Sequence, residues 1–117
     1  MNILMIINDP PYGTEKAYNA LRLAMALQKE QADAEVRVFL MADAVTCAVS
    51  DQNTPNGYYN IGRMLRLILS KRGEVGLCGS CMDARGVQEA SCLQGTRRST
   101  MNELAQWTIK ADKVLVF

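Results

Sequence analysis

The apolar run NILMII at residues 2–7 decides the fold, because five hydrophobic side chains follow one another without interruption. A continuous apolar run of this length is typical of a strand that is buried on both faces of a parallel sheet. The run ends in NDPPYGT at residues 8–14, whose proline and glycine residues favour a turn. We therefore predict that the chain begins with an interior strand and a connection to a helix.

The segments that follow alternate between helix and strand patterns. Apolar residues at helical spacing predict a helix from an N-cap at Thr14 to about Gln31. Further strands are expected over 35–41, 74–78 and 113–117, with a candidate strand over 95–99. Further helices are expected over 42–50, 58–71 and 80–85. A last helix is expected after a capping box formed by Thr100 and Glu103. This alternation predicts one α/β domain over residues 1–117, with a mostly parallel sheet, right-handed crossovers and helices on both faces.

The charge balance limits the classes of partner. Thirteen basic and twelve acidic residues give a net charge of +1, so we expect no binding to nucleic acid or to an anionic membrane. No apolar run approaches the roughly 20 residues that a membrane-spanning helix needs, and no basic segment precedes the first apolar run. We therefore expect a cytoplasmic protein whose cysteines are reduced. The helix expected over 58–71 is apolar on more than one side, which suggests contact with another subunit.

The sequence contains no histidine, which removes the usual general base near neutral pH. Hydrolysis by a histidine-assisted serine or cysteine is thereby excluded. The carboxylates are scattered along the chain, in no pattern typical of a glycosidase. Any chemistry is therefore expected to use sulfur.

The segment GLCGSCMDARG at residues 76–86 carries the candidate site, at the junction of an expected strand and an expected helix. Helix N–H groups at Gly79 and beyond favour the thiolate form of Cys78. Cys81 falls in the first helical turn, and Arg85 follows it by four positions on the same face, where its charge stabilises an anionic sulfur. Such a thiolate can accept sulfane sulfur or attack a disulfide without help from histidine.

The four cysteines also allow interpretations other than sulfur transfer. A metal site usually needs four soft ligands, and only one closely spaced pair is present, so no metal is expected. We expect Cys47 and Cys92 to pack as small apolar side chains. Thiol–disulfide exchange by Cys78 and Cys81 is the main alternative chemistry, and a non-enzymatic oligomeric module whose thiols only pack is the third interpretation.

The turn at residues 8–14 is a second candidate region. Asp9, Pro10 and Tyr12 are expected either to shape a pocket over Cys78 or simply to form the crossover turn. The turn lacks the glycine pattern of a phosphate loop, so no nucleotide and no other cofactor is expected. Arg97 and Arg98 could bind an anion or an acidic patch of a protein, but they are interpreted as part of a solvated loop.

Three segments together give the chain a resemblance to a known family: residues 1–27, GLCGSCMDARG at 76–86 and ADKVLVF at 111–117. The sequence resembles the DsrE/DsrF-like family, and in particular its small YchN-type branch. The resemblance implies a flavodoxin-like or Rossmann-like fold and a homo-oligomer, often a hexamer built from trimers, with cysteine sites near subunit boundaries.

The resemblance also implies a role for individual residues. Cys78 matches the cysteine that relays a persulfide in family members, while Arg85 and Gly86 match the basic residue and glycine that follow it. Cys81 is present in the YchN-type branch but absent from several relay members, and we interpret it as a resolving or protective thiol. The leading hypothesis is a sulfurtransferase-like carrier that passes sulfane sulfur between donor and acceptor proteins; whether it is an enzyme is left open.

Overall fold

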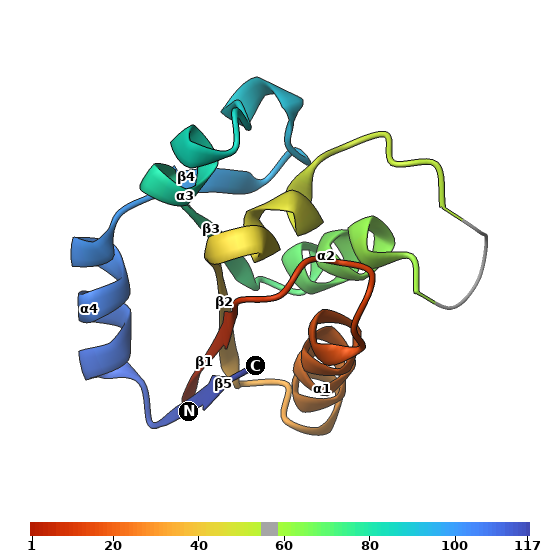
Figure 1. The fold of residues 1–117 in the computed structure, drawn as a ribbon. Coiled ribbons are helices and arrows are strands. Elements are labelled where there is room, and N and C mark those ends of the chain that lie inside the picture. Colours follow the sequence, from red (N-terminus) through yellow and green to blue (C-terminus); the bar gives the residue numbers. More distant parts are fainter. Residues whose placement is uncertain (55–58) are drawn as a thin grey trace.

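The predicted strand at residues 2–7 is β1 (Asn2–Ile7) of a five-stranded sheet in the computed structural model, which describes residues 1–54 and 59–117 (Figure 1). The sheet has the order β4-β3-β2-β1-β5, and all four neighbouring pairs are parallel. The other strands are β2 (Glu35–Leu40), β3 (Glu74–Cys78), β4 (Thr96–Ser99) and β5 (Lys113–Val116). Strand β1 lies inside the sheet, between β2 and β5. Its uninterrupted apolar sequence fits this position, because both faces of the strand are covered.

Helices cover both faces of the sheet, as predicted. Helices α1 (Lys16–Glu30) and α2 (Ile61–Ser70) pack together on one face, and α4 (Met101–Lys110) lies on the other (Figure 1). Two short helices follow the C-terminal ends of strands, η1 (Ala42–Ala48) after β2 and α3 (Gly79–Ala84) after β3, and a third, η2 (Glu89–Ser91), lies between α3 and β4. The fold class, a single α/β domain with a parallel sheet, is confirmed.

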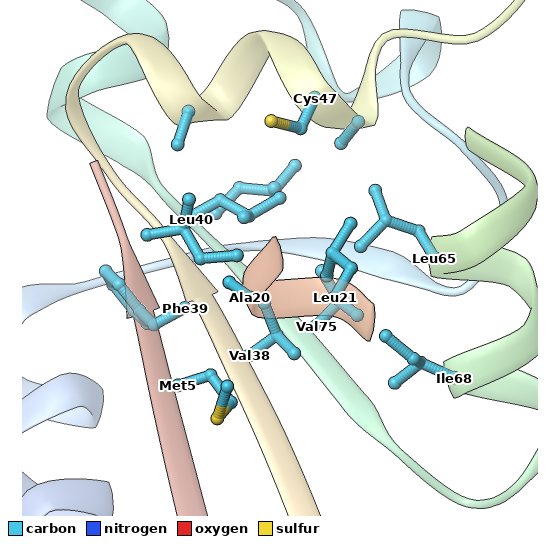
Figure 2. Close-up of a cluster of buried hydrophobic side chains, with 14 of the residues drawn as sticks. Met5, Ala20, Leu21, Val38, Phe39, Leu40, Cys47, Leu65, Ile68 and Val75 are labelled. Carbon is cyan, nitrogen blue, oxygen red and sulfur yellow. The ribbon is translucent and has the colours of Figure 1, made fainter. Parts of the chain in front are cut away.

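A hydrophobic core fills the space between the sheet and the α1–α2 pair (Figure 2). Leu21 of α1 and Leu65 of α2 are fully buried against strand residues such as Val38 and Val75. Burying a side chain of this size stabilises the fold by about 1.5–3 kcal/mol. This core holds β2 and β3 rigid where they approach the candidate site.

The opposite face is filled mainly by the indole of Trp107 from α4. Its ring meets that of Phe39 edge to face, with 6.1 Å between ring centroids. A Cβ atom at Gly76 would lie 3.2 Å from the indole, so the glycine in β3 leaves room for this ring. The guanidinium groups of Arg37 in β2 and Arg97 in β4 lie over the Trp107 ring. These cation–π contacts attach α4 to the two strands.

Two predicted helix starts need correction. The N-cap of α1 is Glu15 rather than Thr14. The Thr14 hydroxyl donates to the Asp9 carboxylate and accepts from the Lys16 N–H at 3.4 Å, so it lies one residue before the cap. Helix α2 begins at Ile61, capped by Asn60; of the helix expected from residue 58, Tyr58 lies outside the described residues.

Other predictions at helix ends hold in part. The helix expected over 42–50 is the 3₁₀ helix η1, which ends at Ala48. At α4, Thr100 accepts the N–H of Glu103 as predicted, at 3.2 Å. The Glu103 carboxylate accepts from the Ser99 hydroxyl rather than from the Thr100 N–H, so only half of the capping box forms.

Candidate functional site

The C-terminal ends of β1, β2 and β3 meet at one edge of the sheet and bring the candidate residues together. The register pairs Ile7 with Leu40 and Leu40 with Leu77, so the residues that follow these strands lie level. In open α/β sheets this edge is where ligands and chemistry are found. Cys78, the last residue of β3, lies on it.

Cys78 is nearly enclosed but retains polar neighbours. The residue is 4% exposed, and its Sγ lies 3.4 Å from the Ser80 hydroxyl oxygen. Burial opposes ionisation, but the Ser80 hydroxyl, the Cys81 thiol and the N–H groups of Cys81 and Ser80 outweigh it and lower the pKa of the Cys78 thiol. These donors favour the anionic form of the sulfur.

Cys81 has the opposite tendency. Burial and the neighbouring Cys78 sulfur raise the pKa of the Cys81 thiol, against the lowering effect of the Ala42 N–H. That N–H donates to Cys81 Sγ at 3.2 Å, from a residue in the left-handed backbone region with φ of 51°. The two thiols are therefore unequal: Cys78 is the better thiolate, and Cys81 is the better hydrogen-bond donor.

Arg85 reaches the outer side of this pair. Its Nε donates to the Asp43 carboxylate at 2.8 Å, and its Nη1 donates to the Cys81 carbonyl at 3.1 Å. Its charge contributes a small lowering of the Cys81 pKa. Arg85 thus lies close to Cys81 and ties α3 to η1, and its guanidinium is bound by a carboxylate.

Among the described residues, no hydrogen bond joins the first turn to Cys78; the Asp9 carbonyl accepts from the Cys47 thiol instead, at 3.8 Å. Asp9 accepts the Thr14 hydroxyl, Pro10 is half-buried, and the exposed Tyr12 donates its hydroxyl to the Tyr59 carbonyl at 2.6 Å. These contacts fasten the crossover to the segment before α2. They are contacts that a crossover turn needs, and a role of Asp9, Pro10 and Tyr12 in shaping a pocket over Cys78 stays a prediction.

The remaining two cysteines have other surroundings than the pair. Cys47 is fully buried in the core, and burial raises the pKa of its thiol to about 12. Cys92 is half-buried, and its thiol is 3.6 Å from the Gln88 carbonyl that accepts from it. In the described ranges 1–54 and 59–117, no three cysteine, aspartate or glutamate side chains are grouped so that they could hold a metal ion.

Arg98 is a neighbour of the site that the sequence interpretation missed. Residues 97–98 belong to strand β4, which confirms the candidate strand over 95–99 and corrects the interpretation as a solvated loop. The Arg98 guanidinium donates twice to the Asp83 carboxylate, at 2.8 Å each, and lies against Gly79. Arg97 lies on the other face of the sheet and donates to Glu103 at 2.9 Å. Successive side chains of a strand point to opposite faces of the sheet, so the candidate strand over 95–99 was the signal that the two arginines lie on different faces.

These features define a class: a small parallel α/β domain whose third strand ends in a pair of unequal thiols. The chain belongs to the DsrE/DsrF-like family, whose pattern matches it over residues 1–117. This finding confirms the resemblance drawn from GLCGSCMDARG and the two ends of the chain.

Individual relatives agree with this assignment. The chain is 43% identical to protein YchN of Escherichia coli over 115 residues, which are 98% of this chain and 97% of that protein. An uncharacterized protein of Methanopyrus kandleri is 36% identical, over 98% of this chain and 93% of its own length.

Solved structures extend the comparison to the fold. The crystal structure of the Escherichia coli YchN protein matches with a TM-score of 0.95 and 42% identity, covering 100% of this chain and 99% of that one. A protein of unknown function from Methanobacterium thermoautotrophicum shares the fold at 10% identity, with a TM-score of 0.78 and coverage of 99% and 97%. Among the described residues, no helix combines the length and hydrophobicity needed to cross a membrane.

Proposed function

We propose that this protein is a sulfur carrier in which Cys78 holds sulfane sulfur as a persulfide. The Cys78 thiolate attacks the outer sulfur of a donor persulfide, a new sulfur–sulfur bond forms, and the donor's own sulfur–sulfur bond breaks. The donor leaves as a thiolate, so the transfer needs no external oxidant or reductant. Attack by an acceptor thiolate on the outer sulfur then returns Cys78 to its thiolate form.

The observation that carries this proposal is the difference between Cys78 and the other cysteines. Of the four thiols, only Cys78 has a pKa below its ordinary value. The anionic form is both the nucleophile in loading and the leaving group in unloading. Because the residue is 4% exposed, the bound sulfur is also shielded from bulk solvent.

Cys81 is proposed to act after Cys78. Its thiol stabilises the anionic Cys78 sulfur by hydrogen bonding. When its own proton is lost, its sulfur can attack Cys78 Sγ, which forms the Cys78–Cys81 disulfide and expels the outer sulfur as hydrosulfide. A dithiol reductant must then restore both thiols.

We also infer that the donor and acceptor are proteins in the cytoplasm and that the carrier is a homo-oligomer, with a trimer or hexamer as the expected form. Support for an assembly comes from apolar side chains left on the surface. Leu67 of α2 is 43% exposed, and Val116 of β5 is 64% exposed. Exposed apolar groups indicate a protein interface where they form a contiguous patch.

The test is to load the reduced protein with a persulfide donor and to locate the added sulfur by mass spectrometry. We expect a gain of one sulfur atom on Cys78, which cyanide removes. Cys78→Ser is expected to abolish the gain, whereas the matched variant Cys92→Ser is expected to load normally. Absence of added sulfur on Cys78 in the folded protein would contradict the proposal.

Thiol–disulfide exchange is the second candidate, favoured by the unequal pKa directions of the two thiols in one Cys-x-x-Cys segment. It predicts a Cys78–Cys81 disulfide whose reduction potential lies within the cytosolic range. Titration against glutathione, with alkylation and mass readout, distinguishes it from the carrier. A protein that loads sulfur but forms this disulfide only under much more oxidising conditions is a carrier.

A further inference from the structure

Arg98 and Gly79 together form a feature that neither the sequence motif nor the family match assigns. Gly79 is the first residue of α3, and its backbone lies outside the left-handed region that requires glycine. A Cβ atom there would lie 2.9 Å from both Cζ and Nε of Arg98 and 3.0 Å from its Nη2. The missing side chain at Gly79 therefore matters because the guanidinium occupies that space.

The position of the guanidinium is fixed from two further sides. Asp83, one turn along α3, holds it through two hydrogen bonds of 2.8 Å in the bidentate geometry that orients arginine well. The backbone N–H of Arg98 donates to Glu89 of η2 at 2.7 Å, which fastens the strand that carries it. The result is a cation held against the residue that immediately follows Cys78.

We propose that Arg98, seated in the space left by Gly79 and oriented by Asp83, is a positioning residue whose charge adds to the hydrogen bonds that favour the anionic sulfur of Cys78. Its effect on the thiolate is independent of sulfur transfer; its effect on the persulfide rests on the proposed function. This assigns to Arg98 the charge that the sequence interpretation gave to Arg85. Gly79 contributes by having no side chain, which lets the Arg98 guanidinium approach the backbone next to Cys78.

The other charged and titratable groups near the thiol do not supply this charge. Both arginines are paired with a carboxylate, but they differ in position: Arg85 binds the Cys81 carbonyl and its charge lowers the pKa of Cys81. Asp83 and Glu89 are acidic and oppose ionisation of a neighbouring thiol. The pKa of Arg98 is raised mainly by Asp83 and, as one of its smaller contributions, by the charge on Cys78, which agrees with an attraction between guanidinium and sulfur.

The test measures the rate at which iodoacetamide modifies Cys78 as a function of pH, with the site located by mass spectrometry. Arg98→Gln is expected to shift the profile to higher pH and to slow modification at pH 7 about threefold, as a half-unit rise in pKa requires. Arg97→Gln is the matched control, since it removes the same charge from the adjacent residue on the opposite face; its profile is expected to be unchanged.

Two more variants separate charge from general damage to the fold. Gly79→Ala displaces only the end of a flexible side chain and is expected to shift the profile as Arg98→Gln does. In the double variant Gly79→Ala/Arg98→Gln the two shifts should not add, because both remove one interaction. Arg98→Lys keeps the charge, so its pH profile is expected to shift by less than half as much as that of Arg98→Gln.

An unchanged profile in folded Arg98→Gln, additive shifts in the double variant, or a shift in Arg98→Lys more than half as large as that in Arg98→Gln would each overturn the inference. Folding of each variant is checked by circular dichroism. Because alkylation reports the thiolate without any sulfur donor, failure here is distinct from failure of the carrier proposal. A protein that loads no sulfur can still show the Arg98-dependent profile, and the reverse also holds.

Discussion

Cys47 and Cys78 lie in two regions at the same edge of the sheet, and both are almost fully buried, yet their thiols behave in opposite ways. Cys47 belongs to η1 and is surrounded by the core, which raises its pKa to about 12 (Figure 2). Cys78 ends β3 beside a hydroxyl, a second thiol and free N–H groups, and its pKa is lowered. Burial alone therefore does not decide thiol reactivity at this edge; the polar groups around the sulfur do.

The largest expected effect is the difference in alkylation rate between these two cysteines in the native protein. The pKa of about 12 for Cys47 and a lowered pKa for Cys78 imply thiolate fractions at pH 7 that differ by on the order of a thousandfold. Timed alkylation with peptide mass mapping measures both rates in one sample. Comparable rates for the two cysteines would remove the basis of the comparison.

Replacing Cys47 tests the packing half of the comparison. Cys47→Ala removes a fully buried sulfur from the core and is expected to lower the free energy of unfolding by about 1–2 kcal/mol. Urea denaturation measures this change. The half-buried Cys92 provides a matched control, Cys92→Ala, with a smaller expected loss. Neither variant should alter the modification of Cys78.

Replacing Ser80 tests the polar half. Ser80→Ala removes the hydroxyl that lies 3.4 Å from Cys78 Sγ, so the pKa of Cys78 is expected to rise and its alkylation at pH 7 to slow about fivefold. Stopped-time alkylation over a pH series gives the shift. Ser70→Ala, at an exposed position of α2, serves as control and should leave the profile of Cys78 in place.

The smallest effect concerns the opposite face of the sheet, where charge stabilises packing. The Ser99 hydroxyl, together with Arg97 and against some burial, lowers the pKa of Glu103 in the folded state. This contribution to stability is present above the ordinary glutamate pKa and is lost as pH falls through the folded-state value. Glu103→Gln is therefore expected to cost about 0.5 kcal/mol at pH 7, discounted for exposure.

The two proteins should converge as pH falls below the ordinary glutamate pKa and through the lowered folded-state value, because the wild-type carboxylate then becomes protonated. Thermal or urea unfolding across pH 3–7 checks this. A difference that grows toward low pH has the wrong sign and would contradict the assignment. Alkylation of Cys78 should be the same in Glu103→Gln as in the wild type, which keeps the two faces separate.

Local patterns were sufficient to predict most of the fold. The uninterrupted apolar run of β1 and the glycine-flanked β3 each correspond to a strand with the predicted bounds. Helix ends were less accurate: the folded turn gives the Thr14 hydroxyl two local partners, the Asp9 carboxylate and the Lys16 N–H, and α1 begins one residue later than predicted. Such local competition is a common reason for errors of one or two residues at helix ends.

The candidate site could be predicted only in part, for a reason of distance along the chain. Cys78 and Cys81 are three positions apart, and their relation is visible in the sequence. Arg98 lies fifteen positions from the carboxylate that orients it, and Tyr12 lies 47 positions from the carbonyl it binds. Contacts of this kind are created by the order of strands in the sheet, which no single segment encodes.

The pairing of β1 with β5 has a consequence for folding on the ribosome. Ile3 is level with Lys113 in the sheet, and the N–H of Asn2 donates to the Asp112 carboxylate across 110 positions of sequence. During translation β1 cannot pair with β5 until residues 113–116 have emerged from the exit tunnel, so one edge of β1 has no partner strand before then. This high contact order favours slow completion of the sheet, and a nascent chain lacking those residues presents an open strand edge to chaperones or to aggregation.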